Sequence, residues 1–154
     1  MSKSLKRVRA VLESSGIETE IRETPLARTA ADAAAALDIE IDQIAKSIIF
    51  RGETSGEAIL FITAGGNTVK ADKAATLVGE ALGKADAALI RAQTGFAIGG
   101  VAPVGHVNPI RAFFDPRLQD FGLVWAAAGT PHHVFSADPT ALLDLSKAQQ
   151  ADFV

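Results

Sequence analysis

Two short apolar segments joined by a polar turn constrain the fold of this chain most strongly. Residues 47–50 and 58–63 are rich in isoleucine, leucine and phenylalanine, and residues 51–57 between them are polar and contain two glycines. Apolar runs of this length, bounded by such a turn, are typical of β-strands that return antiparallel to each other. The sequence therefore predicts a β-hairpin in the middle third of the chain.

Helical and extended patterns alternate along the rest of the chain. Thr29–Asp32 has the form of a helix-capping box, and Asp138–Pro139 has the order of an N-cap followed by proline. Because hairpins connect most of the expected strands, the pattern favours one α+β domain over residues 1–154 rather than a regular βαβ winding. The expected helices are 5–12 (with a stop at Gly16), 30–37, 72–82, a short segment after 90, and 139–145; the other expected strands are 17–21, 89–90, 111–114, 124–128 and 132–136, with turns at 65–67 and 129–131.

Composition excludes several classes of protein. Of all residues, 48% are apolar and 21% are charged, which favours a folded domain over a disordered chain. No apolar run approaches the roughly 18 residues that cross a membrane, and residues 1–7 are polar, unlike a secretory signal, so we expect a cytoplasmic protein. The absence of cysteine excludes disulfides, thiol nucleophiles and cysteine-ligated metal sites. A net charge of −3 argues against coating of a nucleic-acid duplex, although a few well-placed cations suffice to bind one end of an RNA.

Lys46 stands within the apolar segment Ile44–Phe50. A cation in such a segment is costly to bury unless an anionic group meets it. One interpretation places the aliphatic stem on apolar neighbours and the amine in water, which is common. The other directs the amine inward, at a phosphate or a carbonyl oxygen. The spacing alone favours the first interpretation.

Glycines are concentrated in the segment Thr94–His106. Such a loop leaves backbone N–H and C=O groups free to approach a ligand closely. Residues 99–103 are consistent with a tight connection between strands, or with a nest of N–H donors that holds a developing oxyanion. Neither GxGxxG nor GxxxxGKS/T is present, so the loop is not a nucleotide fingerprint. Together with Lys46, the loop suggests a site for a small, partly anionic molecule.

The histidines indicate neither a metal site nor a triad. His132 and His133 are adjacent, and adjacent residues on a strand point to opposite faces, so they cannot easily share one metal ion. At most one of them faces a pocket, and a surface position beside a hairpin turn explains each of them at least as well; the same holds for His106. No serine lies in a GxSxG elbow, and nothing in the sequence connects Asp115 or Asp120 with a histidine.

Four segments of the chain match one known family in the same order and at the right spacing. They are Arg28–Ala34, Gln43–Phe50, Thr94–His106 and Trp125–Phe135. Each motif is weak alone, but four in register are specific, and the likeness extends from about the first helix to the last. On these residues the chain resembles the YbaK/ProRS-associated family, the trans-editing relatives of the prolyl-tRNA synthetase insertion domain.

The resemblance implies an α+β domain with a mixed, mostly antiparallel β-sheet surrounded by helices. It also implies hydrolysis of a wrongly attached amino acid from tRNA, with no metal, no cofactor and no covalent intermediate. Because an aminoacyl ester is already activated, positioning a water and stabilising an oxyanion can do much of the catalysis. In the family, the residue corresponding to Lys46 contacts the terminal adenosine, and Gly99, the first residue of the G-x-x-x-P loop, lies beside the scissile ester. The implied substrate contacts are Thr29, Ser47, Gly100, Val101, Pro103, Gly129, His132 and His133.

The segment Ala127–His133 departs from part of the family. Members that clear cysteine carry a serine-alanine-glycine-arginine pattern there, which this chain lacks. We therefore expect a deacylase that removes alanine or another small amino acid from the 3′ end of aminoacyl-tRNA. A synthetase or an elongation factor is a further possible partner, and neither a membrane nor DNA is expected. The alternative is a non-catalytic module that binds a tRNA 3′ end, a nucleotide or a free amino acid; a general nucleic-acid-binding protein fits poorly with the acidic balance and the low aromatic content.

Overall fold

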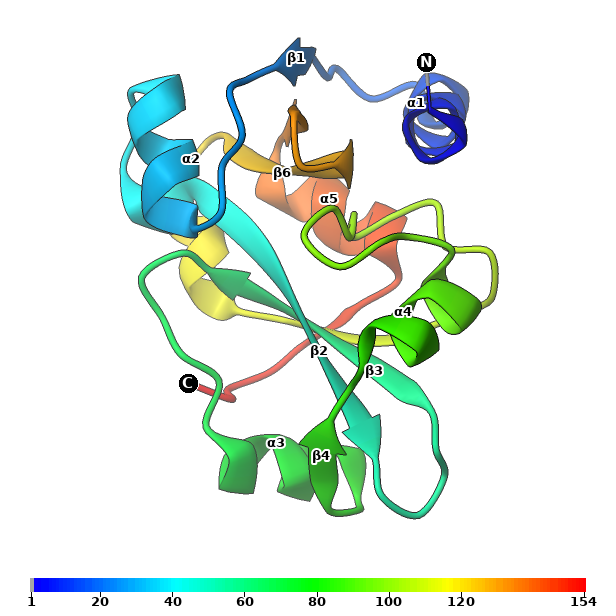
Figure 1. Ribbon diagram of the computed structural model, residues 1–154. Helices are drawn as coiled ribbons and strands as arrows, with labels where there is room; N and C mark the ends of the chain where they lie inside the picture. The colour runs from blue at the N-terminus through cyan, green and yellow to red at the C-terminus, as the bar shows by residue number, and fades with distance from the viewer. Residues whose placement is uncertain (1) are drawn as a thin grey trace.

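The computed structural model describes residues 2–154, which form an α+β fold with one mixed sheet and helices around it (Figure 1). The strand order is β1-β7-β6-β2-β3-β5-β8, and β4 also pairs with β2. Four of the seven strand pairings are antiparallel, so the predicted fold class is confirmed. Within residues 2–154, no helix is both long and apolar enough to cross a membrane. The elements are α1 (Lys3–Ser15), β1 (Ile21–Glu23), α2 (Ala30–Leu37), the 3-10 helix η1 (Ile41–Gln43), β2 (Ile44–Gly52), β3 (Ala58–Ala64), α3 (Ala71–Val78), β4 (Leu82–Lys84), α4 (Ala87–Thr94), β5 (Arg111–Phe114), the 3-10 helix η2 (Pro116–Asp120), β6 (Val124–Thr130), β7 (His133–Ala137), α5 (Pro139–Ser146) and β8 (Gln149–Gln150).

The predicted hairpin is confirmed as the centre of the sheet. β2 and β3 pair antiparallel from Ala45 opposite Ala64 to Arg51 opposite Ala58. All seven residues of β3 are buried, as expected for a strand with covered faces. In Figure 1 this pair runs diagonally through the molecule, with α2 near its upper end and α3 near its lower end.

The second edge of β2 is only partly paired. The parallel strand β6 pairs with it at Ile44 and Ala45, and β4 pairs with it from Phe50 to Gly52. Between these two contacts, residues 46–49 have no strand partner on that edge within the described part of the chain. The sheet is therefore open beside the segment that contains Lys46.

Lys46 and Ser47 lie on opposite faces of the sheet, because successive side chains of a strand alternate. Ser47 is opposite Ile62, which belongs to the core that α1 and the glycine loop help to form. Lys46 is opposite Thr63 and shares a face with Ile48, which packs on a second, phenylalanine-rich core. The open edge of β2 can thus be approached along both faces.

Arg7 of α1 holds the two ends of the glycine loop. Its Nε donates a hydrogen bond to the Gly105 carbonyl at 3.0 Å, and its Nη2 donates to the Gly95 carbonyl at 3.0 Å. The guanidinium also lies 4.8 Å from the ring centre of Phe96, a cation–π distance. Inside the loop, His106 Nε2 is 2.7 Å from the Ala102 carbonyl, and burial lowers the pKa of this imidazole. The structure therefore assigns His106 to loop support.

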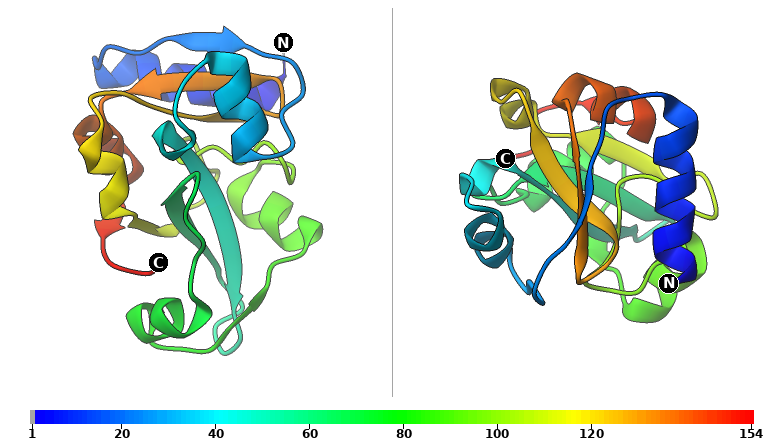
Figure 2. Two further views of the ribbon diagram at one scale, coloured as in Figure 1. Left: turned by 90° about the vertical axis from the view of Figure 1, so that its left-hand side faces the viewer. Right: turned by 90° about the horizontal axis from the view of Figure 1, so that it is seen from above.

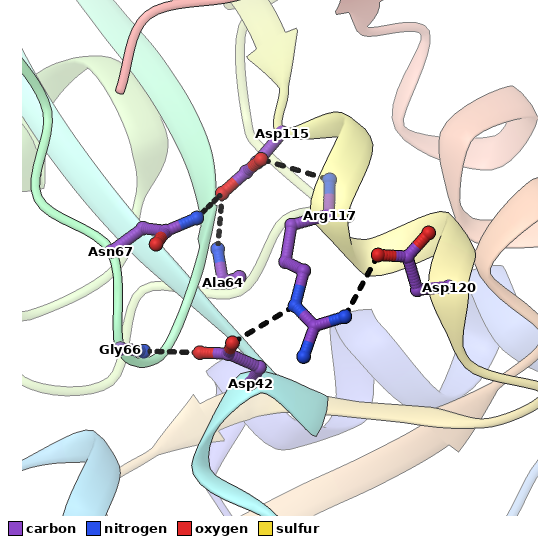
Figure 3. A network of polar contacts seen from close by, with 7 residues as sticks. All are labelled: Asp42, Ala64, Gly66, Asn67, Asp115, Arg117 and Asp120. Atoms are coloured by element: carbon purple, nitrogen blue, oxygen red, sulfur yellow. Dashed lines mark hydrogen bonds and ion pairs between the residues drawn. The ribbon is translucent and has the colours of Figure 1, made fainter.

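A second polar network holds the turn at residues 65–67, next to Lys46 (Figure 3). The buried Asp115 carboxylate accepts hydrogen bonds from the Ala64 amide at 3.0 Å and from Asn67 Nδ2 at 2.9 Å. Asp42 accepts from the Gly66 amide at 2.8 Å and from Arg117 Nε at 3.0 Å. Loops far apart in sequence are thereby joined around one turn.

The expected helix over 72–82 is too long, and the strand at 89–90 is wrong. Gly79, with φ of +89°, ends α3 after Val78 because this left-handed conformation suits glycine, and Leu82 begins β4. Residues 89–90 lie inside α4, where the Asp86 side chain caps the Leu89 amide at 2.8 Å. The N-cap outweighed the short apolar pair on which the strand prediction rested.

Two boundaries near the ends of the sheet also differ from the expectation. The first strand begins at Ile21 rather than 17, and β6 continues through Gly129 and Thr130, which were expected in a turn. The turn is at Pro131 and His132, so His132 precedes β7 rather than opening it. A register shift between Ala127 and Thr130 marks a bulge, which carries the strand past its expected end.

Replacing Asp115 with alanine should lower the free energy of unfolding by about 2–4 kcal/mol, because the buried Ala64 amide would lose its acceptor. Asp120→Ala is the matched control. Its carboxylate pairs with Arg117 in the same network but is 60% exposed, so the expected loss is below about 1 kcal/mol. Urea unfolding of both variants measures the difference, and equal losses would contradict the structural role of Asp115.

Candidate functional site

A cleft of about 710 Å³ lies at the open edge of β2. It reaches residues 45–49 of β2, the start of α2, the tip of the glycine loop, and the hairpin of β6 and β7. In Figure 2, left, α2 lies beside the upper end of β2. The segments that line the cleft come from widely separated parts of the chain. Its lining includes Arg28, Thr29, Lys46, Ser47, Lys84, Ile98, Gly99, Val101, Trp125, Ala127, Thr130 and His133.

Most of the site residues expected from the sequence meet in this cleft, and four do not. Those that line it are Thr29, Lys46, Ser47, Gly99, Val101 and His133. Those outside its lining are Gly100, Pro103, Gly129 and His132.

Two of the four outside residues are glycines at close backbone contacts. A β-carbon on Gly100 would lie 2.9 Å from the Thr130 Cα, so this glycine lets the loop pack on the end of β6. A β-carbon on Gly129 would lie 2.9 Å from the Ser4 carbonyl, against α1, and the residue has φ of +97°. Pro103 is a buried residue of the glycine loop. The two glycines therefore serve close packing of the backbone rather than contact with the cleft.

The Lys46 amine is directed inward. Its Nζ donates a hydrogen bond to the Gly65 carbonyl at 3.2 Å, and the side chain is half-buried. Among the salt bridges of residues 2–154, none involves Lys46. An ammonium group has three N–H donors, so further donors remain for a ligand. The turn at residues 65–67 also orients Lys46. The Asp115 carboxylate holds this turn through Ala64 and Asn67, and the Gly65 carbonyl of the turn accepts the hydrogen bond from the lysine.

Gly99 occupies a tight turn at the tip of the loop. The Gly100 amide donates to the Ala97 carbonyl at 3.1 Å, and Gly99 has φ of +91°, the geometry of the third residue of a type II turn. In the described part of the chain, the amides of Gly99 and Val101 make no backbone hydrogen bond. Unpaired amides at a cleft are donors available to a carbonyl oxygen or an anion.

The cleft is cationic although the chain is acidic overall. Arg28 and Lys84 line it together with Lys46, and no aspartate or glutamate is among its lining residues in the range 2–154. The sequence analysis missed both additional cations as site residues. Arg28 directly precedes Thr29, the capping residue of α2, so the capping motif was a signal for its position. No sequence pattern placed Lys84 near Lys46.

Two hydroxyl groups complete the polar lining. The Thr130 Oγ1 and the His133 Nδ1 are 2.7 Å apart, which fixes the imidazole at the cleft wall. The Ser47 Oγ is shielded from solvent and has no hydrogen-bond partner within residues 2–154. Buried hydroxyls are normally paired, so this group is available to a bound molecule. No group of three or more His, Asp or Glu side chains in this range is placed to hold a metal ion.

The cleft contains cations that can bind an anion, backbone amides that can donate hydrogen bonds, and an apolar wall. Three cations suit a phosphate-bearing ligand, and the loop amides suit a polarised carbonyl. Trp125 and Ala127 add apolar surface to the lining of the cleft. With no carboxylate among the lining residues, a paired-carboxylate mechanism has no groups to use there.

Known proteins share the fold and part of the sequence of this chain. Over 99% of this chain and 97% of the other, the fold matches a solved structure of a candidate trans-editing enzyme for prolyl tRNA synthetase, with 45% identity and a TM-score of 0.90. The structure of the hypothetical protein APE2540, at 24% identity, shares the fold over 95% of this chain and 97% of its own, with a TM-score of 0.86. The uncharacterized protein YwhH of Bacillus subtilis is 29% identical over 144 residues, 93% of this chain and 91% of YwhH.

The family comparison covers the whole cleft. The aminoacyl-tRNA editing domain matches residues 24–145, a range that contains every residue lining the cleft, from Ala27 to Val134. The resemblance found in the four sequence motifs is thereby confirmed. This chain belongs to the aminoacyl-tRNA editing domain family.

Proposed function

We propose that the chain, as a single editing domain over residues 1–154, is a freestanding deacylase of mischarged aminoacyl-tRNA. The observation that carries the proposal is the cleft with three cations and no lining carboxylate, next to a glycine turn with unpaired amides. A tRNA 3′ end presents both complementary parts, phosphate groups and an ester carbonyl. Family membership supports editing as the process, and the cleft chemistry supports ester hydrolysis as the step.

The proposed reaction consumes one water. Its oxygen bonds to the carbonyl carbon of the aminoacyl ester, the bond from that carbon to the ribose oxygen breaks, and the ribose oxygen takes up a proton. The products are a free amino acid and a tRNA with a free terminal hydroxyl. Lys46 holds the terminal adenosine through its phosphate, and the Gly99 amide faces the oxyanion that forms on the carbonyl. The neighbouring ribose hydroxyl of the substrate is the proposed group that orients the water.

We further propose that the amino acid is alanine or another small residue. The wall contributed by β6 and the turn after it presents Ala127, Thr130 and Pro131, and this segment lacks the serine-alanine-glycine-arginine pattern of cysteine-clearing relatives. Within residues 2–154 the cleft lining has no carboxylate that could pair with a cationic side chain, and Ala127 and Pro131 make this wall largely apolar, so an uncharged side chain fits this surface best.

Lys46→Ala should lower kcat/KM for the mischarged tRNA by about 100-fold or more, since a positioned charged donor to the substrate is lost. Lys70→Ala is the control, because Lys70 is exposed at the start of α3 and lies outside the cleft lining. Thermal unfolding of both variants checks that the fold is intact. Full activity of a folded Lys46→Ala protein would remove this lysine from the site.

Gly99→Ala should impair hydrolysis by shifting the loop amide from its position, because a left-handed φ disfavours alanine, and Gly79→Ala provides a matched control. The two glycines have φ of +91° and +89°, and a β-carbon on either would meet nothing within 4 Å. Both substitutions therefore carry the same left-handed penalty, about 1 kcal/mol in the free energy of unfolding. Only Gly99→Ala should lose hydrolysis, and equal activity of the two variants would contradict the role of the loop amide.

A panel of tRNAs mischarged with different amino acids tests the reaction and its specificity together. Release of the amino acid should be fastest for alanine and other small uncharged residues and slowest for large or charged ones. Binding of every tRNA without release would favour the non-catalytic module, and preferential release of a large residue would overturn the proposed specificity. The assay measures loss of ester-linked radiolabelled amino acid over time.

A further inference from the structure

A second cavity, of about 510 Å³, lies on the other side of the β6–β7 turn from the cleft. Thr130 and His133 line both, so the turn is a shared wall. Its remaining lining comes from α1 and its N-cap, from β1 and from the turn itself, namely Ser2, Leu5, Arg9, Ile21, Glu23 and His132. This is where the structure places His132, which the sequence analysis expected in the amino-acid pocket.

Arg9 is the group in this cavity that lacks a partner. Its Nε is shielded from solvent and makes no hydrogen bond within residues 2–154, and no salt bridge in that range involves its guanidinium. Arg9 as a whole is half-buried, and a shielded N–H donor without an acceptor is unfavourable. Arginine is also the side chain whose planar fork best matches a phosphate or carboxylate. The arrangement indicates that an anion completes the site.

The surroundings narrow the class of ligand. Along α1, the segment 3–9 contains four basic residues and no acidic one, whereas the whole chain has a net charge of −3. Glu23 also lines the cavity and forms no salt bridge with Arg9. The cavity therefore contains both a cation and a carboxylate that can accept a hydrogen bond from a hydroxyl group. One nucleotide of RNA offers both complements, a phosphate for Arg9 and a ribose 2′-hydroxyl for Glu23.

The turn between the two cavities is well supported. The Thr24 amide donates to the His132 carbonyl at 2.7 Å, and the His132 amide donates to Thr130 Oγ1 at 3.1 Å. A strand of RNA could therefore cross a defined ridge, with its last nucleotide in the cleft and an earlier one in the second cavity. Pro131 and His132 are exposed on this ridge.

We infer that the second cavity is a subsite for the sugar-phosphate of a nucleotide that precedes the terminal adenosine, with Arg9 as its phosphate ligand. The identity of the RNA rests on the proposed function. The subsite contributes affinity for the RNA and takes no part in breaking the ester. Its loss should therefore affect binding of long substrates and leave short ones unchanged.

The test measures binding of a fluorescent RNA hairpin with a single-stranded CCA end to wild-type protein, Arg9→Gln and Arg91→Gln. Arg91 is an exposed arginine on α4 that lines neither cavity, so it controls for net charge. Arg9→Gln should weaken binding about tenfold, the value of one charge-assisted hydrogen bond. The slope of log affinity against log salt should also become shallower by about 0.7, the loss of one phosphate contact to a single strand. Arg91→Gln should leave both quantities unchanged.

Hydrolysis of a minimal substrate separates the subsite from the reaction. The 3′-alanyl ester of adenosine 5′-monophosphate keeps the phosphate that Lys46 is proposed to hold but has no preceding nucleotide, so Arg9→Gln should hydrolyse it at the wild-type rate while its KM for mischarged tRNA rises. Unchanged RNA binding by Arg9→Gln, or an equal loss with both substrates, would overturn the subsite. Arg9→Lys keeps the charge and should retain most of the RNA affinity, which distinguishes a lost contact from a damaged fold. Failure of the wild-type protein to hydrolyse either substrate would instead refute the proposed function, and the binding comparison would still decide the subsite.

Discussion

The interrupted pairing of β2 is the constraint on which the site depends. One edge of this strand is paired with β3 from Ala45 to Arg51, and the other is paired only near its two ends. The gap makes room for a cleft at the middle of an otherwise continuous sheet. Because side chains alternate along a strand, one short segment delivers a lysine to one face and a serine to the other. A fully paired β2 would leave no cleft at that position.

The two walls of the cleft are held from outside it by separate polar contacts. Arg7 joins both ends of the glycine loop to α1, and the buried Asp115 carboxylate holds the turn whose Gly65 carbonyl orients Lys46. Neither residue lines the cleft. Groups that hold a backbone from behind leave its amides and carbonyls free on the side of the ligand. This suits a site that acts through positioning more than through reactive side chains.

Local chemistry explains which predictions from the sequence were correct. The hairpin, the Thr29 cap of α2 and the proline start of α5 depend on neighbouring residues, and all three are present. The reciprocal bond of a capping box is not formed at Thr29, because the Asp32 carboxylate accepts from the Arg28 amide instead. The strand expected at 89–90 was wrong because a capping aspartate three residues earlier set a helix instead. The turn expected at 129–131 was misplaced because a bulge extends β6, and a bulge has no distinctive sequence pattern here.

The sequence by itself determined the family, the fold class and the inner residues of the cleft, since these are encoded in motifs of contiguous residues such as Gln43–Phe50 and Thr94–His106. The tertiary structure alone decided which residues meet. It brought Lys84 and Arg28 to Lys46, left His132 outside the cleft that His133 lines, and directed the lysine inward where spacing had favoured solvent. The physical reason is that a local sequence pattern specifies the conformation of its own segment. Which segments lie side by side in a mixed sheet depends on strand pairing between residues far apart in sequence, such as Ile44 and Trp125.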